Sequence, residues 1–250
     1  AFGKQHAEIE QHHRADRSRP QADGAGHAAG AGQLRAENLP LVNVCDGDLV
    51  DVFVVEEFLD AAAQQHARAA GRLSDLRDMY AALTEVVREE YPSGRVFSDI
   101  GCYTLGWLAP LHAIDTCVDM GASITMAKGA ADAGQHPSVA VIGDSTFTHS
   151  GMTGLLDAVN ERADITVIIS DNLTTGMTGG QDSAGTGRLE QICAGIGVDP
   201  AHIRTVVPLP KNREEMKAVI REEIAHRGVS VIIPRRECIQ TAKRHNAAKK

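Results

Sequence analysis

The chain has 250 residues, of which 43% are hydrophobic and 23% charged, the ordinary composition of a globular protein with one sizeable core. Its net charge of −8 argues against a nucleic-acid partner, because binding to a phosphate backbone needs a basic face. No apolar run approaches the length of a membrane span, and the first residues lack the apolar segment of a secretory signal. We therefore expect a cytoplasmic protein that neither spans a membrane nor binds nucleic acid.

The cysteines do not have the spacing of a metal or cluster site. None of them forms a Cys-x-x-Cys pair, and an odd number in a cytoplasmic chain favours free thiols over a disulfide framework. Iron–sulfur clusters usually take four thiolates with close pairs among them, so we do not expect a cluster in this chain. The cysteines are Cys45, Cys102, Cys117, Cys193 and Cys238.

The first part of the chain lacks the pattern of a packed domain. Residues 11–36 are poor in large apolar side chains and rich in Ala, Gly, His and Arg, so they cannot bury enough surface to offset the entropy of ordering. Residues 49–70 have apolar positions at helical spacing, although residues 52–55 are equally compatible with a short strand. We interpret residues 1–78 as an N-terminal extension that is partly disordered or divergent.

An ordered domain is predicted over residues 79–240. It opens with an amphipathic helix over 79–90, which the Tyr-Pro-Ser-Gly sequence at 91–94 ends. Apolar strands then alternate with helices, which predicts an α/β fold with a doubly wound, mostly parallel sheet and a ligand site at the carboxyl edge. The expected strands are 95–98, 139–142, 165–169, 203–207 and 229–233, and the expected helices are 123–133, 154–160, one ending at 192–197, and 214–225. Residues 241–250 are a basic tail, which we expect to be solvated.

Residues 139–172 have the pattern of a βαβ unit with polar residues after both strands. Gly143 and Asp144 follow the first strand, and Asn172 follows the second. In a right-handed crossover both strands end at the same edge of the sheet, so Asp144 and Asn172 are expected to come close. Carboxylate and amide oxygens suit a hard cation such as Mg²⁺, which commonly also binds phosphates. The alternative for Asp144 is a turn residue that caps the following helix.

Four separated motifs resemble those of one known family, in the expected order. They are DIGCYTLG at 99–106, DTCVDMGASITMAKG at 115–129, Gly-Asp-Ser at 143–145 and DNLTTGMTGGQ at 171–181. Over about residues 79–240 the chain resembles the thiamine diphosphate-binding domain of the 2-oxoacid:ferredoxin oxidoreductases, most of all the large subunit of the indolepyruvate branch. Ser145 stands where the wider thiamine enzymes usually have Gly, and this departure matches the indolepyruvate branch.

The resemblance implies a site for thiamine diphosphate and Mg²⁺. It makes the Asp144 carboxylate, the Asn172 side chain and the backbone carbonyl of Thr174 the metal ligands. It places Cys102 beside the thiazolium and lets His149 shuttle a proton or contact the substrate carboxylate, so both are candidate catalytic residues. The implied cofactor-binding residues are Gly101, Cys102, Tyr103, Gly121, Ala122, Ser123, Gly143, Asp144, Ser145, Asn172, Thr174, Gly176, Met177 and Thr178.

Several of these residues have a structural alternative. A small buried hydrophobe at a strand end is an equal interpretation of Cys102, and a core position is the alternative for Met177. Plain helix–sheet packing would select the same small residues at 121–123. Ser150 is the more natural cap of the helix after Asp144, so His149 is not needed for capping and a functional role is favoured.

The resemblance also implies the activity and the partners. The reaction is the oxidative decarboxylation of 2-oxoacids of the indolepyruvate type to acyl-coenzyme A, with ferredoxin as electron acceptor. The implied partners are a pyrimidine-binding domain or subunit, ferredoxin, coenzyme A and the 2-oxoacid, in an oligomer whose iron–sulfur clusters lie elsewhere.

Part of the family pattern is missing. A Cys-Pro-Gly-Cys-Pro-His type motif ahead of residue 79 is replaced by ARAAGRLSDLRD, and residues 1–78 do not match the pyrimidine-binding domain. We therefore expect no activity without a partner. A non-oxidative 2-oxoacid decarboxylase or synthase subunit and a non-catalytic fragment or assembly module remain open alternatives.

Overall fold

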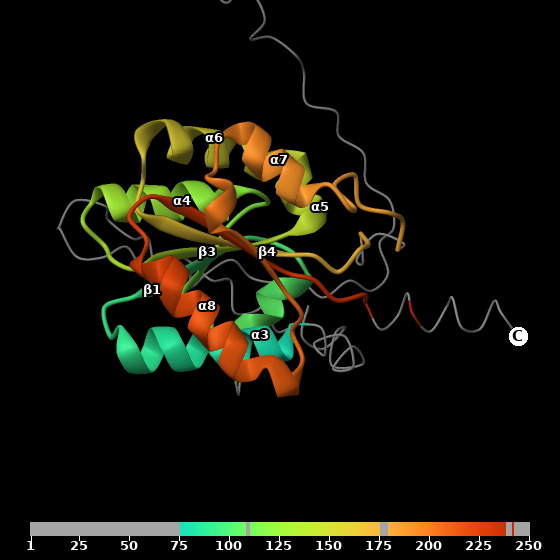
Figure 1. Ribbon diagram of the computed structural model, residues 1–250, viewed down its shortest axis with the longest axis horizontal. Helices are drawn as coiled ribbons and strands as arrows, with labels where there is room; N and C mark the ends of the chain where they lie inside the picture. The colour runs from blue at the N-terminus through green and yellow to red at the C-terminus, as the bar shows by residue number, and fades with distance from the viewer. Residues whose placement is uncertain (1–75, 109–110, 176–179, 239–241, 243–250) are drawn as a thin grey trace, which may run out of the picture. The chain divides into compact units, whose positions relative to one another are not determined.

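The computed structural model describes residues 76–108, 111–175, 180–238 and 242, and a six-stranded parallel sheet forms their centre (Figure 1). The strand order is β2-β1-β3-β4-β6-β5. Strands β3, β4 and β6 are rich in Val and Ile and are buried along their whole length, because helices cover both faces of the sheet. The strands are β1 (Arg95–Ser98), β2 (Thr116–Cys117), β3 (Ser138–Gly143), β4 (Ile165–Ser170), β5 (Ile203–Val206) and β6 (Val229–Pro234).

Helices lie on both faces of this sheet. Figure 1 shows α4, α6 and α7 on one face and α3 with α8 on the other. The helices are α3 (Arg77–Thr84), α4 (Ala122–Asp132), α5 (Asp144–Thr146), α6 (Met152–Glu161), α7 (Leu189–Ile196) and α8 (Arg213–Ala225). A π-helical turn over Glu85–Glu90 extends α3, and another over Phe147–Gly151 joins α5 to α6. Short 3-10 turns cover Cys102–Trp107, Pro200–His202 and Pro210–Asn212. The predicted doubly wound α/β fold is confirmed.

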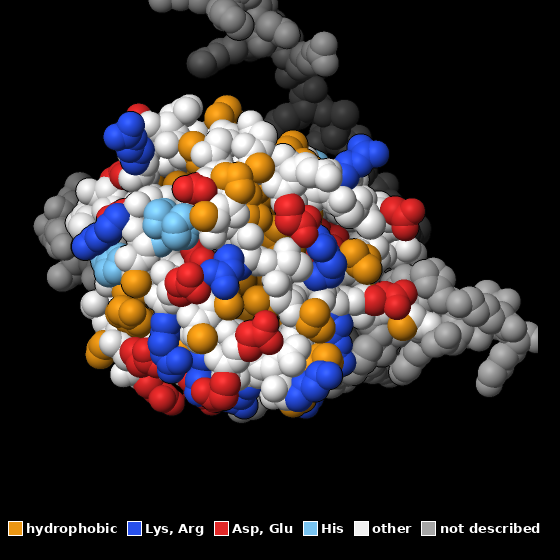
Figure 2. Space-filling view, in the orientation of Figure 1, with side chains coloured by type: hydrophobic (Ala, Val, Ile, Leu, Met, Phe, Trp, Pro, Cys, Tyr) orange, Lys and Arg blue, Asp and Glu red, His pale blue; other side chains and the backbone are white. Residues whose placement is uncertain are grey.

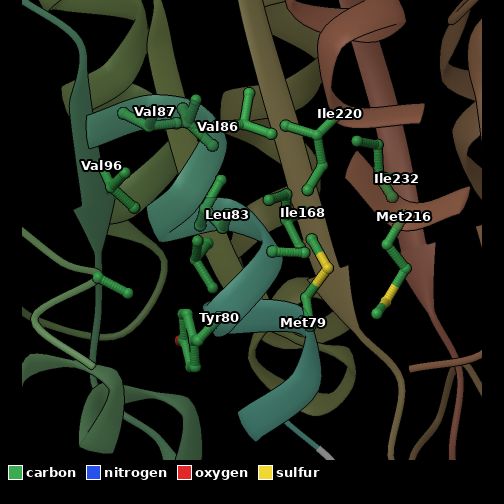
Figure 3. Packing of buried hydrophobic residues seen from close by; sticks show 14 of the residues in the cluster. Met79, Tyr80, Leu83, Val86, Val87, Val96, Ile168, Met216, Ile220 and Ile232 are labelled. Atoms are coloured by element: carbon green, nitrogen blue, oxygen red, sulfur yellow. The ribbon is translucent and has the colours of Figure 1, made fainter. Parts of the chain in front are cut away.

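A hydrophobic core lies between the sheet and the helices α3 and α8. Tyr80 and Leu83 of α3 pack with Ile168 of β4 and Ile220 of α8, and each is at most 1% exposed (Figure 3). Burying a side chain of this size contributes about 1.5–3 kcal/mol. A second core lies on the opposite face of the sheet, under α4, α6 and α7. The central strands are therefore held from both sides.

The register of β3 and β4 positions the polar residues that follow them. Gly143, the last residue of β3, lies opposite Ser170, the last residue of β4. A slip of one residue would turn every buried side chain to the other face, so burial on both faces holds this register firmly. Asp144 and Asp171 therefore leave the sheet at the same edge, and Asp99 leaves β1 there as well.

The structure differs from the sequence predictions at three places. The sequence pattern does not predict β2, because two residues carry no periodicity. The helix after β3 begins at Asp144 instead of near residue 154, because buried packing of Phe147 outweighs the turn propensity of its Ser, Thr and Gly residues. Ser150 thus lies inside the helical segment, where its hydroxyl donates to the Met120 carbonyl at 3.0 Å, and the prediction that it caps the helix is wrong.

Other predictions concern parts of the chain outside the described residues. These are the extension up to residue 75, the segment 176–179 and the tail from residue 243. Within the described ranges, no helix is long and apolar enough to cross a membrane. On the face shown in Figure 2, Lys and Arg side chains are interspersed with Asp and Glu and do not gather into one basic patch.

Candidate functional site

A cavity of about 240 Å³ opens at the carboxyl edge of the sheet. Its walls come mainly from the segments that follow β1, β3 and β4, which is where open parallel sheets bind their ligands. The lining residues are Leu76, Ile100, Gly101, Cys102, Tyr103, Met120, Gly143, Asp144, Ser145, Thr146, Ser170, Asn172, Thr174 and Thr175.

Asp144 is a buried acid whose charge is not compensated. It is 3% exposed, and its Oδ1 accepts a hydrogen bond from the Ser145 N–H at 2.7 Å. Its Oδ2 is buried and has no hydrogen-bond partner among the described residues. No Lys, Arg or His of these residues forms an ion pair with Asp144. Burial raises the pKa of this carboxyl to about 7, and repulsion from Asp171 adds to the effect while the bonds from Ser145 oppose it. A buried charge of this kind is costly unless a cation joins it.

Tyr103 forms one wall of the cavity and explains the glycine before Asp144. A Cβ atom on Gly143 would lie 2.5 Å from the Tyr103 ring, so only glycine allows the ring to pack against the end of β3. The Tyr103 hydroxyl donates to the Asp99 carboxylate, and the Tyr80 hydroxyl donates to the Tyr103 carbonyl at 2.6 Å. Burial raises the pKa of Tyr103 well above its ordinary value, so its hydroxyl remains a donor. Tyr103 is thereby held through its hydroxyl and through its backbone carbonyl.

Asp99 anchors the segment that leads into α4. It is fully buried, and its Oδ2 accepts hydrogen bonds from the Gly121 N–H at 3.1 Å, the Ser123 N–H at 3.2 Å and the Ser123 hydroxyl at 2.6 Å. Gly121 has a φ of 94°, a left-handed conformation that favours glycine. Burial raises the pKa of Asp99, and these hydrogen bonds oppose the rise. Unlike Asp144, Asp99 has hydrogen-bond donors at both of its carboxylate oxygens.

The loop after β4 carries the other two predicted metal ligands. The Asn172 Oδ1 accepts from the Thr174 N–H at 3.1 Å, which closes an Asx turn. The Thr174 hydroxyl and the Thr175 N–H both donate to the Gln181 carbonyl, at 3.1 and 2.8 Å. The Thr175 hydroxyl lies 2.9 Å from the Ser145 hydroxyl. These contacts join the loop after β4 to the start of α5.

Arg235, just after β6, fixes the same loop through two acids. Its Nε bonds the Asp171 carboxylate at 2.6 Å, and its terminal nitrogens bond both oxygens of Glu190 at 2.8 and 3.0 Å. The hydrogen bonds from Arg235 are the largest cause that lowers the pKa of Glu190 to about 2. The Cys238 N–H donates to the Asn172 carbonyl at 3.1 Å. The segment after β6 therefore holds Asn172 from its backbone side.

The cavity brings together predicted residues from three distant segments of the chain. Those that line it are Gly101, Cys102, Tyr103, Gly143, Asp144, Ser145, Asn172 and Thr174. Gly121, Ala122 and Ser123 lie at the start of α4 and do not line it, and His149 is exposed on the π-helical turn before α6 and does not line it either. The residues outside the described ranges are Gly176, Met177 and Thr178. The roles assigned to all of these residues stay predictions.

Sequence reasoning missed some residues of this edge. Arg235 carries no motif, and its contact with Asp171 arises only because β6 lies beside β4. Its position could have indicated it, because it lies two residues after the predicted strand 229–233, and residues that follow parallel strands meet at the ligand-binding edge. Met120 lines the cavity at 45% exposure, and no sequence signal singles it out.

The oxygen atoms at this edge fit a hard divalent cation that also binds a phosphate. The partnerless Oδ2 of Asp144 is an anionic oxygen, and the Asn172 amide and the hydroxyls of Ser145 and Thr175 lie at the same cavity. The described residues hold no cluster of three or more His, Cys, Asp or Glu side chains suited to a metal. A cation at Asp144 would therefore take its other protein ligands from neutral oxygens.

A doubly wound parallel sheet with a cavity at its carboxyl edge is the arrangement of a cofactor-binding α/β domain. Residues 99–233 match the family described as thiamine pyrophosphate enzyme, C-terminal TPP binding domain, and the chain belongs to this family. The family resemblance indicated by the motifs is thereby confirmed.

Named relatives refine this result. The chain is 40% identical over 168 residues to the indolepyruvate oxidoreductase subunit IorA of Archaeoglobus fulgidus. The matched region covers 63% of this chain and 26% of that protein. It is 35% identical over 165 residues to the subunit of the same name from Pyrococcus abyssi. This match covers 56% of this chain and 25% of that protein. The chain thus spans about a quarter of the length of these curated relatives.

A solved structure agrees with the fold. The 2-oxoglutarate:ferredoxin oxidoreductase from Magnetococcus marinus superposes with a TM-score of 0.54 at 14% sequence identity, over 66% of this chain and 62% of that one. At this identity the likeness concerns the fold alone.

Proposed function

We propose that the chain is the thiamine diphosphate- and Mg²⁺-binding part of an oxidoreductase that oxidatively decarboxylates 2-oxoacids of the indolepyruvate type, forming acyl-coenzyme A and reducing ferredoxin. The observation that carries the metal site is the buried Oδ2 of Asp144, which has no partner in the part of the chain that the structure describes, in a chain of a thiamine pyrophosphate enzyme family. The relatives named indolepyruvate oxidoreductase subunits support the substrate class.

Three groups hold the cation in this proposal, namely the Asp144 carboxylate, the Asn172 side chain and the Thr174 carbonyl. Asp144 is the anionic ligand among them, so it supplies most of the electrostatic attraction. The bond from the Ser145 N–H at 2.7 Å already orients its carboxylate. The Asx turn at Asn172 and the backbone bond from Cys238 hold the amide in place before any ligand binds.

The remaining cavity residues shape the space next to the cation. Bound thiamine diphosphate supplies a nucleophilic carbon and an electron sink for the loss of CO₂ from a 2-oxoacid. The fixed Tyr103 ring and Gly143 define the wall against which the cofactor would lie, and Cys102 is proposed beside its reacting part. His149 is exposed and outside the cavity, so it would reach a substrate only in a site that a partner completes.

Partners are part of the proposal. A domain or subunit that binds the pyrimidine of the cofactor, ferredoxin, coenzyme A and the 2-oxoacid would meet this chain in a cytoplasmic oligomer, with the iron–sulfur clusters elsewhere in the complex. The chain spans about a quarter of its curated relatives, which supports a need for further parts. A second candidate is a cofactor-binding module without activity of its own, because residues 1–78 do not match a pyrimidine-binding domain.

Calorimetric titration with thiamine diphosphate tests the cofactor site. We expect binding in the presence of Mg²⁺ and none with excess EDTA. Asp144→Ala should abolish the Mg²⁺-dependent binding, because the cation loses its anionic protein ligand. The matched control is Asp157→Ala on α6, whose exposed side chain lies away from the cavity and should leave binding unchanged. Unchanged affinity in Asp144→Ala would mean that Asp144 only starts the helix.

An activity assay separates the two candidates. The purified chain should not decarboxylate indolepyruvate with a dye as electron acceptor, even when it binds the cofactor. Activity that appears on addition of a partner subunit would support the oxidoreductase. Continued inactivity with every co-purifying partner would favour the non-catalytic module, and turnover by the chain alone would contradict the need for a partner.

A further inference from the structure

The loop between the end of β4 and α7 contains a second buried oxygen without a partner. Ser183 is 5% exposed, and its hydroxyl has no hydrogen-bond partner among the described residues. Its segment lies beside the one that carries Asp144, because Gly185 packs against the Thr148 side chain, and the Thr148 hydroxyl donates to the Asp144 backbone carbonyl at 3.2 Å. Asp144 Oδ2 and the Ser183 hydroxyl are thus two buried oxygens on neighbouring segments that have no partner within the described ranges.

Contacts on both sides of Ser183 hold it in this place. On one side, the Gln181 carbonyl accepts from the Thr175 N–H at 2.8 Å and from the Thr174 hydroxyl. On the other side, Gly185 packs so tightly that a Cβ atom there would lie 2.6 Å from the Thr148 side chain, on the turn that follows α5. The position of the Ser183 hydroxyl is therefore fixed by the same two segments that carry the predicted metal ligands.

Two buried oxygens without partners are unfavourable for a chain with nothing bound. An unsatisfied buried hydroxyl costs free energy because its hydrogen bonds to water are lost, and a buried carboxylate without a cation costs more. A cation between these oxygens removes both costs, since it accepts a lone pair from each. The described residues offer no third His, Cys, Asp or Glu at this position, so the site suits a hard cation with several neutral oxygen ligands.

We propose that the Ser183 hydroxyl is a further ligand of the divalent cation that Asp144 binds, an inference that rests on the cation site of the proposed function. Ser183 then completes the side of the cation that faces the loop after β4. The Asn172 and Thr174 oxygens and a bound diphosphate supply the remaining positions.

Binding of Mn²⁺ in place of Mg²⁺ tests this proposal, because electron paramagnetic resonance counts the free ion directly. The full chain is titrated with Mn²⁺ at saturating thiamine diphosphate. We expect Ser183→Ala to weaken Mn²⁺ binding about tenfold, since the variant loses one bond to a charged group. Ser138→Ala is the matched control, because Ser138 is equally buried but donates to the Gln135 carbonyl at the opposite edge of the sheet.

Stability without cation separates a ligand from a structural residue. Without Mn²⁺, Ser183→Ala should be at least as resistant to urea as the unmodified chain, because it removes an unsatisfied buried hydroxyl. Ser138→Ala should be less resistant, because it breaks a hydrogen bond, yet it should bind Mn²⁺ normally. Loss of urea resistance in Ser183→Ala with unchanged Mn²⁺ affinity would overturn the proposal.

A change of metal tests direct ligation. Ser183→Cys replaces a hard oxygen by sulfur, so it should bind Cd²⁺ more tightly relative to Mn²⁺ than the unmodified chain does. Ser138→Cys should not change this ratio, which controls for the thiols already present. An unchanged ratio in Ser183→Cys would show that the side chain does not touch the ion.

The failure of this inference differs from the failure of the proposed function. If the unmodified chain binds Mn²⁺, Asp144→Asn abolishes the binding and Ser183→Ala has no effect, only the role of Ser183 is wrong. If the unmodified chain binds no Mn²⁺ with thiamine diphosphate present, the cation site itself is wrong and the inference falls with it.

Discussion

Two buried acids at opposite edges of the sheet differ in how their charge is balanced. Glu223, near the end of α8 and the amino-terminal ends of the strands, pairs with the His202 Nδ1 at 2.9 Å and with Arg204 at 3.3 Å. Its backbone carbonyl accepts from the hydroxyls of Thr166 and Ser230. Asp144, at the carboxyl edge, has one oxygen without any partner among the described residues. The acid at one edge is paired within the described residues, and in the proposed function the acid at the other edge is paired by a bound cation.

Asp99 shows that a buried acid at the carboxyl edge can also have its hydrogen-bond partners within the chain. It lies at the same carboxyl edge as Asp144, and it accepts bonds from Tyr103, Gly121 and Ser123. An acid with these partners stabilises the fold, whereas in the proposed function the buried acid without partners among the described residues binds a cation. Substitutions at these acids should therefore have effects of different kinds.

The largest effect is expected at Asp99. Asp99→Ala leaves the Tyr103 hydroxyl and the donors of Gly121 and Ser123 without their acceptor, so it should lower the free energy of unfolding by about 3 kcal/mol or more. Urea denaturation measures the loss. Asp119→Ala, an exposed acid two residues before Gly121, is the control and should change little. A loss as small as the control's would mean that these bonds do not anchor α4.

A smaller loss is expected at Glu223. Glu223→Gln should destabilise the chain by about 2 kcal/mol, less than for a fully buried pair because the Arg204 side chain is 34% exposed. Affinity for Mn²⁺ and thiamine diphosphate should not change, since the substitution is at the other edge. The neighbouring Glu222→Gln removes an exposed partner of Arg204 and serves as the control. If Glu223→Gln altered cation affinity, the two edges would not be independent.

The smallest effect is expected at Glu190, and it depends on pH. The folded-state pKa of Glu190 is lowered from 4.5 to about 2, so its pairing stabilises the chain above pH 4.5 and this contribution is lost as pH falls toward 2. Glu190→Gln should cost at most about 1 kcal/mol at neutral pH, because the side chain is 38% exposed.

Thermal unfolding over this pH range checks the Glu190 prediction. The difference between Glu190→Gln and the unmodified chain should shrink as the pH is lowered below 4.5. Glu161→Gln, an exposed acid at the end of α6, should show no such trend. A difference that stays constant with pH would mean that the Arg235 pair contributes no charge-dependent stability.

The sequence predicted the central fold well because its signals are local. The run Ile165–Ser170 is β-branched and uninterrupted, and the alternation of such runs with helices is enough to predict a parallel sheet. The start of the helix at Asp144 could not be predicted in the same way. Its Ser, Thr and Gly residues favour turns, and only packing against the rest of the molecule makes them helical.

The candidate site was predictable in part for the same reason. Asp144 and Asn172 follow two strands of one βαβ unit, so topology alone brings them to one cavity. Arg235 and Ser183 were not predicted, because the strand order sets the contacts of Arg235 and the path of a loop sets the position of Ser183. Loop paths depend on contacts such as that between Gly185 and Thr148, which no local pattern encodes.

The most direct test of the central claim is urea denaturation of Asp144→Asn with and without Mg²⁺ and thiamine diphosphate, at about pH 8. Without ligands we expect the variant to be more stable than the unmodified chain, because a buried unpaired charge is replaced by a neutral amide. With ligands at a hundredfold excess over Kd, the unmodified chain should gain about 2.7 kcal/mol and the variant nothing. A variant that is less stable without ligands and still gains stability from them would contradict the account, because Asp144 would then be a structural residue like Asp99.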